Sequence, residues 1–274
     1  MRVRRLVLIA VILLLASCAA AVPANPAASP SPAPIGPGPD YGGAPTLATS
    51  APSPIASPSV APSLGPSPVG QRLASAQADF DCDGRPDLLE FFNAPRPGSY
   101  ESVQAGKLAR LTLGAGGVVE LPFDGMPFDD PGRSPLIGIA DVNGDGCDDA
   151  IVTVGRGAST TWTSFLVYDG NELRRVEEDG KPVTFLFGGS VSHGNAIECR
   201  TRKDATEIIA RAVSDYTSDF QWDAVEDVHH WSSKSQLVLW STSRSVIVVS
   251  VRYAMPTDQD RYWGLSCGSV KLAG

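Results

Sequence analysis

The sequence predicts an all-β fold for residues 71–274, and three observations carry that prediction. Glycine, proline, threonine, valine and serine are spread through the region, a composition that disfavours long helices. Apolar residues alternate with polar ones or run in short blocks, as they do in strands. Two acidic turns of one pattern each lead directly into such a block. Residues 200–213 alone show some helical spacing, and the pair Ile208-Ile209 fits a strand at least as well.

Residues 1–17 have the composition of an export signal. Three arginines lie within the first five residues, and an apolar run over 6–15 follows that is too short to span a bilayer. The Leu-Ala-Ser-Cys sequence at 15–18 is similar to a bacterial lipobox, which implies a lipidated Cys18 as the first mature residue. Acyl chains on Cys18 would anchor the protein stably to a membrane. An ordinary signal peptide is the alternative.

Residues 18–70 are expected to form a disordered tether behind the lipidated cysteine. They consist almost entirely of alanine, proline, serine and glycine, and Asp40 is their only charged residue. Such a segment buries too little apolar surface to offset the entropy of ordering, and its prolines favour extended chain. The tether would hold the folded part clear of a membrane or pass through a cell wall. A spacer that serves only solubility is the alternative.

The folded part is acidic. Three of the 22 basic residues lie in the signal and Asp40 lies in the tether, which leaves 19 basic and 29 acidic residues in 71–274, a formal charge of −10. No run of lysine or arginine suggests a nucleic-acid surface, and an acidic surface disfavours anionic lipid. We therefore expect no nucleic-acid partner.

Two stretches obey the acidic pattern D-x-[DN]-x-D-G-x-x-D. Residues 79–87 read DFDCDGRPD and residues 141–149 read DVNGDGCDD, so the copies begin 62 residues apart. Carboxylates crowded into one short turn repel one another unless a cation neutralises them, and hard oxygen ligands suit a hard divalent ion. We therefore expect one Ca²⁺ in each loop. The predicted side-chain ligands are Asp79, Asp81, Asp83 and Asp87 in the first loop and Asp141, Asn143, Asp145 and Asp149 in the second, with the backbone carbonyls of Arg85 and Cys147.

Calcium is favoured over magnesium because six or more protein oxygens suit its larger shell. Gly84 and Gly146 stand sixth, where the chain must turn through a conformation that is costly for residues with a Cβ.

The first loop also satisfies the EF-hand expression, since Glu90 stands twelfth. An EF-hand needs flanking helices, whereas Pro86 and a strand-like run follow here, and the second loop has Val152 at the twelfth place. A solvated acidic turn without an ion is the alternative.

The spacing of the loops suggests an internal repeat. Residues 111–125 align without gaps on residues 166–180, and each stretch reads as a β-hairpin that ends in Asp-Gly. A weaker third copy starts at Leu237, with its turn expected over 240–245. Aligning 205–209 with 148–152 then places four residues where the second loop has its ligands. These residues are Glu198, Arg200, Arg202 and Thr206, so the third copy is expected to keep the strand and to lack the metal site.

The two loops, each running into a strand, resemble those of the FG-GAP or VCBS-type repeat family. The resemblance covers about 79–274 and implies a β-propeller-like arc, here of about three blade-like repeats, with the loop residues named above as calcium ligands. The family's name-giving Phe-Gly and Gly-Ala-Pro elements are matched only by Phe187-Gly188 and Asn93-Ala94-Pro95.

Four cysteines follow Cys18. An even number in an exported chain predicts two disulfides, because the compartment is oxidising. Three connectivities are possible, and we favour the one that joins neighbouring stretches of chain. It pairs Cys82 with Cys147 and Cys199 with Cys267. Free thiols or a metal site are the alternatives, and the lack of any C-x-x-C pair disfavours zinc.

Other residues have two interpretations each. His193 with Ser190 and Ser192 suggests a nucleophile and its base, yet no G-x-S-x-G elbow is present and a turn histidine is favoured. His229-His230, next to Glu226 and Asp227, suggest a transition-metal site, with a polar turn favoured.

The C-terminal third is rich in tryptophan. Such residues form binding platforms or fill sheet cores, and the core is favoured. They are Trp222, Trp231, Trp240 and Trp263. Residues 255–260 read as an exposed loop.

These observations predict a membrane-anchored module outside the cytoplasm, held on the outer face of a bacterial membrane or envelope. Calcium in two loops would brace its sheets, and an exposed face would bind a protein or a glycan. The module is not expected to be an enzyme. The alternative is a secreted metal-dependent hydrolase that uses one loop as a catalytic metal site; such a site keeps an open coordination position, whereas these ligands form closed local loops.

Overall fold

The computed structural model describes residues 70–94, 106–123, 132–202 and 205–274. The predicted signal, Cys18 and nearly all of the predicted tether lie outside these residues. Seventeen strands and one short helix, α1 (Gln259–Tyr262), are the regular structure of the described part, which confirms the all-β class. No helix there has the length and apolar character that crossing a membrane requires.

The first sheet is a four-stranded antiparallel meander whose strands lie in chain order. Its strands are β1 (Arg72–Ala78), β2 (Asp87–Ala94), β3 (Gly106–Thr112) and β4 (Val118–Phe123). The first acidic loop joins β1 to β2. β3 and β4 form the hairpin predicted from residue 111 onward, and the N–H of Leu113 donates to the carbonyl of Gly117 (3.0 Å) across its turn.

A second meander repeats this plan. Its strands are β5 (Leu136–Ala140), β6 (Asp149–Arg156), β7 (Thr160–Tyr168) and β8 (Leu173–Arg175), each antiparallel to the next. The second acidic loop again joins the first strand to the second. β7 and β8 form the second predicted hairpin, while the start of β7 pairs with β11 (Phe185–Gly189) and so continues into a larger sheet.

The second meander is buried on both faces. Ala150, Val152 and Val154 of β6 pack toward the first meander, against Phe80, Leu89 and Phe91 among others. Ile151 of β6 packs in a different cluster, with Phe165, Phe185, Ile197 and Ile208. Side chains on a strand alternate between faces, so a strand covered on both sides needs the continuous apolar run that β6 has.

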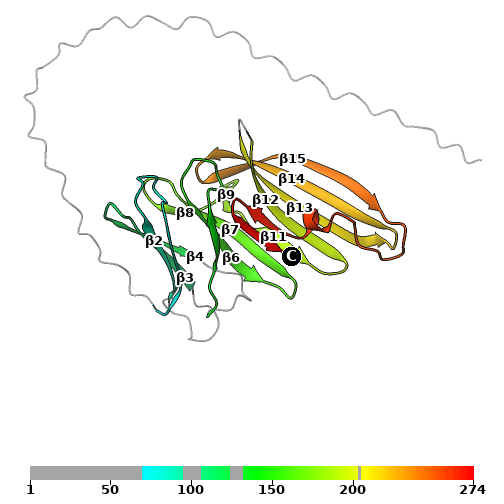
Figure 1. The fold of residues 1–274 in the computed structure, drawn as a ribbon, viewed down its shortest axis with the longest axis horizontal. Helices are drawn as coiled ribbons and strands as arrows, with labels where there is room; N and C mark the ends of the chain where they lie inside the picture. Colours follow the sequence, from blue (N-terminus) through cyan, green and yellow to red (C-terminus); the bar gives the residue numbers. More distant parts are fainter. Residues whose placement is uncertain (1–69, 95–105, 124–131, 203–204) are drawn as a thin grey trace, which may run out of the picture. The chain divides into compact units, whose positions relative to one another are not determined.

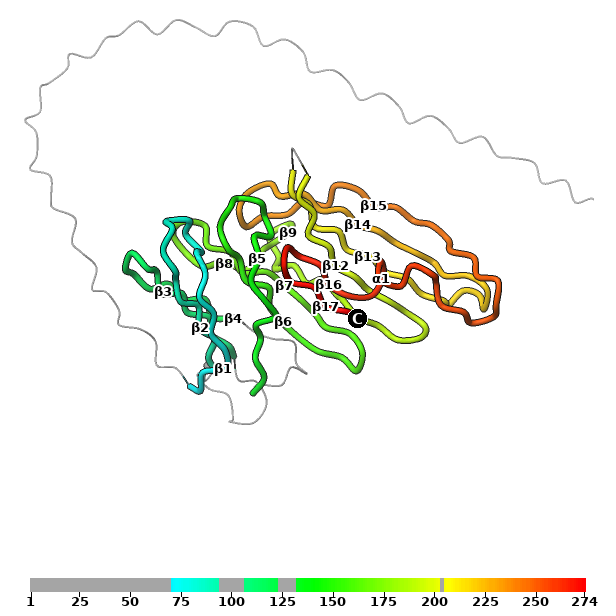
Figure 2. Tube along the Cα trace, viewed as in Figure 1, coloured from blue at the N-terminus to red at the C-terminus, as the bar shows by residue number. Residues whose placement is uncertain are grey.

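The C-terminal half is a meander of long antiparallel strands (Figure 1). Its strands are β12 (His193–Thr201), β13 (Thr206–Ser218), β14 (Gln221–Ser233) and β15 (Gln236–Val248). The short strands β9 (Glu177–Glu178) and β10 (Lys181–Pro182) extend this sheet beyond the start of β15. At the C-terminus, β16 (Gly264–Cys267) runs parallel to β12 and pairs with β17 (Val270–Ala273) (Figure 2).

The turn predicted over 240–245 is wrong, because these residues lie inside β15. Pairing with β14 runs without a shift from Ser241, opposite Val228, to Val248, opposite Gln221. The stretch contains none of the glycine, asparagine or proline that tight turns favour, and the chain reverses instead at Lys234-Ser235.

The strand predicted at 205–209 is confirmed by β13. The described strands do not form a closed barrel, so the propeller-like arc of about three blade-like repeats stays a prediction.

Both favoured disulfides are present. Cys82 bonds to Cys147, with Cα atoms 5.0 Å apart, and Cys199 bonds to Cys267, with Cα atoms 4.5 Å apart. The first bond joins the two acidic loops to each other. The second joins β12 to β16, in which these cysteines lie directly opposite one another.

Candidate metal centre

The last aspartate of the first loop fixes the loop to the sheet. Asp87 is only 1 % exposed, and its carboxylate accepts hydrogen bonds from the N–H groups of Phe80 (2.8 Å) and Gly114 (2.7 Å). Phe80, the second residue of the loop, is buried in the core. A buried carboxylate and a buried ring therefore fix both ends of the turn.

The other acidic groups of the first loop fold inward. The Asp79 carboxylate accepts hydrogen bonds from the N–H groups of Asp83 (3.1 Å) and Gly84 (3.0 Å), and Asp81 accepts from Asp83 (3.1 Å). One oxygen each of Asp79, Asp81 and Asp87 lies within 4.8 Å of the others. These three predicted ligands are thus brought together, whereas Asp83 is outside the group.

The second loop reproduces the wrapping of the first. Asp141 accepts hydrogen bonds from the N–H groups of Gly144 (2.6 Å) and Gly146 (3.0 Å), and Asn143 accepts from Asp145 (2.9 Å). Buried Asp149 accepts from the N–H of Val142 (3.0 Å), as Asp87 does from Phe80. Loops 62 residues apart therefore adopt similar local structures, although the first aspartate accepts from the fifth residue in one loop and from the fourth in the other.

Left-handed backbone conformations occur at two positions of each loop. Gly84 (φ 80°) and Gly146 (φ 87°) are the sixth residues, as predicted. The fourth residues, Cys82 (φ 61°) and Gly144 (φ 79°), also have positive φ, which sequence reasoning missed. Gly144 could have signalled it, since glycine adopts this conformation without a steric penalty.

Like charges and burial act on the loop carboxyls. Burial raises the pKa of Asp149 well above its ordinary value, and the charges of Asp145 and Asp141 add to this rise against the hydrogen bond from Val142. Partial burial, with the charges of Asp87, Asp83 and Asp79, also raises the pKa of Asp81. Unneutralised negative charge is therefore costly in both loops.

One cation already contacts the second loop. The Lys234 ammonium lies 2.9 Å from a carboxylate oxygen of Asp145, and the side-chain amide of Asn143 donates to the Lys234 carbonyl (3.2 Å). Among the described acidic groups, Asp141, Asp145 and Asp149 do not gather as closely as the three aspartates of the first loop. Sequence reasoning missed Lys234, which lies 89 residues beyond Asp145 and carries no local signal.

The two loops lie side by side. Besides the disulfide, the N–H of Asp148 donates to the carbonyl of Asp79 (2.9 Å), and the N–H of Asp79 donates to the Asp148 carboxylate (3.1 Å). Arg85 and Cys147 occupy the seventh positions, and each donates its N–H to an aspartate two residues earlier. The predicted role of their carbonyls as ligands stays a prediction.

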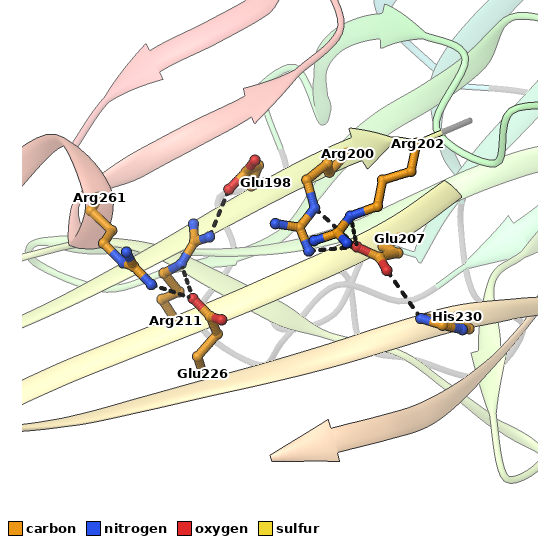
Figure 3. Close-up of polar contacts among 8 residues, drawn as sticks. All are labelled: Glu198, Arg200, Arg202, Glu207, Arg211, Glu226, His230 and Arg261. Atoms are coloured by element: carbon orange, nitrogen blue, oxygen red, sulfur yellow. Dashed lines mark hydrogen bonds and ion pairs between the residues drawn. The ribbon is translucent and has the colours of Figure 1, made fainter. Parts of the chain in front are cut away.

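Three of the four residues expected to replace the ligands in a third loop lie on strands instead, and Arg202 directly follows β12. Figure 3 shows Arg200 and Arg202 beside Glu207 of β13, with Arg200 2.6 Å and Arg202 3.4 Å from its carboxylate. Glu198 pairs with Arg211, which also contacts Glu226 of β14. The fourth residue, Thr206, opens β13 against the second loop, where a Cβ on Gly144 would meet its hydroxyl.

The histidines are held by local partners. His193 opens β12 after the turn, with Nδ1 2.8 Å from the Ser190 hydroxyl, and the described residues place no carboxylate on its ring. The turn predicted at His229-His230 is wrong, since both lie within β14. His229 contacts Glu178 (2.8 Å) and His230 contacts Glu207 (3.2 Å).

The four tryptophans divide between core and surface. Trp222 is buried and donates to the carbonyl of Ala254 (2.9 Å), while Trp231 and Trp263 are partly buried against the core clusters. Trp240 is 68 % exposed and stacks on His230. The exposed loop predicted over 255–260 is confirmed only in part: residues 257–260 are exposed, but Met255 packs partly buried against the core, Pro256 is buried and α1 begins at Gln259.

No protein-family model, curated protein or solved structure matches this chain. The resemblance to FG-GAP and VCBS-type repeats therefore stays a prediction from the loop motif.

Proposed function

We propose that this chain is a membrane-anchored, extracytoplasmic calcium-binding β-repeat module that binds a protein or a glycan. The observation that carries the proposal is the shared geometry of the two acidic loops. Each joins the first and second strands of a four-stranded meander, and each turns its aspartates inward around N–H donors. The two meanders would be the first blades of a propeller-like arc, with β11–β17 completing the domain.

The residues present fit a calcium ion. The first loop brings three carboxylates within 4.8 Å of one another, and hard oxygen donors of this kind suit Ca²⁺. Asp79, Asp81, Asp83 and Asp87 would hold one ion, with Asp141, Asn143, Asp145 and Asp149 holding the other. Bound calcium would supply positive charge that cancels the repulsion within each loop. The loops themselves anchor β2 and β6, so stabilised loops brace both meanders.

The location outside the cytoplasm is supported by the two disulfides, which are compatible with an extracellular protein. The lipid anchor is proposed at Cys18, with residues 19–70 as the tether.

A hollow of about 620 Å³ offers a surface for the partner. It lies between β12, β13, the β16–β17 hairpin and the region of α1, and its lining combines an aromatic ring with charged side chains. The residues that suit recognition of a protein or glycan are Glu198, Arg211, Arg261, Trp263 and Lys271. Screening the full chain against soluble oligosaccharides, with Trp263→Ala as the comparison, tests this surface; equal binding by both chains would remove the hollow from the proposal.

Thermal unfolding of the full chain tests the calcium sites. An ion that binds only the folded state stabilises it by RT ln(1 + [Ca²⁺]/Kd), about 2.7 kcal/mol at a hundredfold excess over Kd. For a domain of this size, this corresponds to a rise in Tm of about 5–10 °C relative to chelator.

Asp81→Asn tests the first loop because Asp81 is one of its three clustered carboxylates. The variant is expected to lose most of the calcium-dependent rise in Tm that the first loop contributes. Asp258→Asn is the matched control, since Asp258 makes no side-chain cap at α1 and lies outside both loops. A wild-type Tm that is equal in calcium and in chelator contradicts the proposal.

A further inference from the structure

The outer edge of β15 is open along most of its length. One edge of this strand pairs with β14, while the other pairs with β9 only at Gln236 and Leu237. Within the described residues, 238–248 therefore have one unpaired edge. These residues are also largely uncovered on their faces. Leu239 is 52 %, Trp240 68 %, Val246 53 % and Val248 78 % exposed.

This edge lacks the features that keep edge strands apart. An exposed strand with free N–H and C=O groups invites pairing with another strand, and proteins usually block it with lysine, proline or a cover. β15 contains neither lysine nor proline, and Arg244 is its only charged residue. A bulge at Trp240 alters the strand's path near one end, but Ser241–Val248 pairs with β14 without a shift.

We propose that β15 pairs antiparallel with β15 of a second copy, forming a dimer through one continuous sheet. Two identical antiparallel strands pair about a two-fold axis, with one residue opposite its own copy. We place Ser243 on the axis. Thr242 then lies opposite Arg244 of the second copy, within the stretch 241–245 that the bulge does not interrupt.

Charge complementarity selects this register. Arg244 makes no ion pair or hydrogen bond within the part of the chain that the structure describes. Asp227 on β14 lies opposite Thr242, and the Thr242 hydroxyl (2.6 Å) is the only hydrogen-bond partner of the Asp227 carboxylate among the described residues.

Residues directly opposite each other share a face, so Arg244 of the second copy lies on the same face as Thr242 and Asp227. It is two strands away from Asp227, about 10 Å between backbones. An extended arginine and the aspartate together span this distance. Symmetry forms the pair twice, whereas a register centred on Arg244 would place two arginines opposite each other.

The remaining contacts are compatible with a second copy. In the proposed register, Ser241 lies opposite Ser245 of the second copy, so small side chains meet on either side of Ser243. The bulge at Trp240 limits this register to residues 241–245. The copies are both acidic and repel at long range. Association therefore depends on a local match, which the chain supplies through Arg244 of β15 and Asp227 of β14.

The oligomeric state of the full chain, measured by sedimentation against concentration, tests the proposal. Wild type is expected to dimerise. Arg244→Glu places a carboxylate beside Asp227 of the second copy and is expected to weaken dimerisation at least about tenfold. Asp227→Arg is expected to do the same by placing two arginines together. The double variant Arg244→Glu/Asp227→Arg reverses the pair and is expected to restore the dimer.

Two controls address charge and location. Lys271→Glu changes the net charge as Arg244→Glu does, but on β17, and is expected to remain dimeric. Ser243→Cys is expected to form a disulfide between copies, whereas Ser250→Cys, far from the axis, is not. Circular dichroism checks that each variant is folded.

The proposal is overturned if the wild-type chain stays monomeric up to about 100 µM, a concentration at which even weak association would be detected. The partner of the β15 edge would then be a strand of another protein. A dimer that neither responds to Arg244→Glu nor cross-links through Ser243→Cys also overturns it. Equal weakening by Lys271→Glu and Arg244→Glu overturns the specific charge pair.

Discussion

A single ammonium group distinguishes the two acidic loops. Lys234 contacts Asp145, and this carboxylate in turn raises the pKa of Lys234, so the lysine stays charged at neutral pH. Among the described residues, only Arg85 pairs with the first loop; its guanidinium is 3.8 Å from Asp83 and largely exposed. The second loop therefore carries its own partial neutralisation, and a metal ion there meets a competing positive charge.

We expect Lys234→Ala to tighten calcium binding at the second loop. Lys234 is nearly half exposed, so water screens its charge strongly. Removing this charge from the neighbourhood of the ion is therefore expected to strengthen the binding free energy of calcium by about 1 kcal/mol, which lowers Kd roughly fivefold. Calorimetric titration measures this in an Asp81→Asn background, which isolates the second loop. Lys181→Ala, an exposed lysine on β10, should leave the affinity unchanged. A weaker affinity in Lys234→Ala would mean that the lysine shapes the loop instead of opposing the ion.

The strands show which parts of the fold local sequence determines. The two acidic loops and the hairpins after them were predicted because glycine, aspartate and alternating apolar residues specify turns and strands within a few positions. The turn over 240–245 was not specified in this way, since Trp240 and the serines after it suit a strand when β14 lies beside them. The placement of Arg200 on β12 and of Arg202 just after it likewise involves Glu207 on the neighbouring strand, a contact that a motif alignment does not contain.

The charged residues between β12, β13 and β14 are expected to make the free energy of unfolding depend on pH. Burial raises the pKa of Glu207, but the hydrogen bond and charge of Arg200, with the charges of Arg202 and His230, outweigh it and lower the pKa below its ordinary value. A carboxyl whose pKa is lower in the folded state than in the unfolded state stabilises the folded protein. This contribution is complete above the unfolded-state pKa, about 4.3, and is lost as the pH falls through the folded-state pKa.

Glu207→Gln is therefore expected to cost about 2 kcal/mol at neutral pH, because it removes charge-assisted hydrogen bonds from a buried group. Urea unfolding between pH 7 and pH 3 is the measurement. The difference from wild type should shrink as the pH falls below about 4. Glu172→Gln, in an exposed turn of the second meander, serves as the control. A constant difference at every pH would mean that shape, not charge, explains the loss.

Long-range cross-links hold the two meanders and the long strands as one domain. The Cys82–Cys147 bond closes 65 residues of chain and joins the metal loops, while Cys199–Cys267 closes 68 residues and joins β12 to β16. Both favoured pairings are confirmed, although chain spacing alone left three connectivities open. The contact of Asp79 with Asp148 shows why the loops, distant in sequence, meet in the fold: each lies at the same end of its own meander, and the meanders pack face to face.

The two disulfides should therefore have equal effects on stability and unequal effects on calcium. Loops of 65 and 68 residues are nearly the same length, so chain entropy predicts a cost of about 4 kcal/mol for Cys82→Ala/Cys147→Ala and for Cys199→Ala/Cys267→Ala alike. Only the first pair restrains the loops, at the fourth residue of one and the seventh of the other, so only its removal should weaken calcium binding. Urea unfolding in chelator measures the common cost, and calorimetric titration at a temperature where both variants are folded measures the difference. Equal calcium affinities in the two double variants would show that the loops hold their shape without the bond between them, and that each meander binds its ion independently.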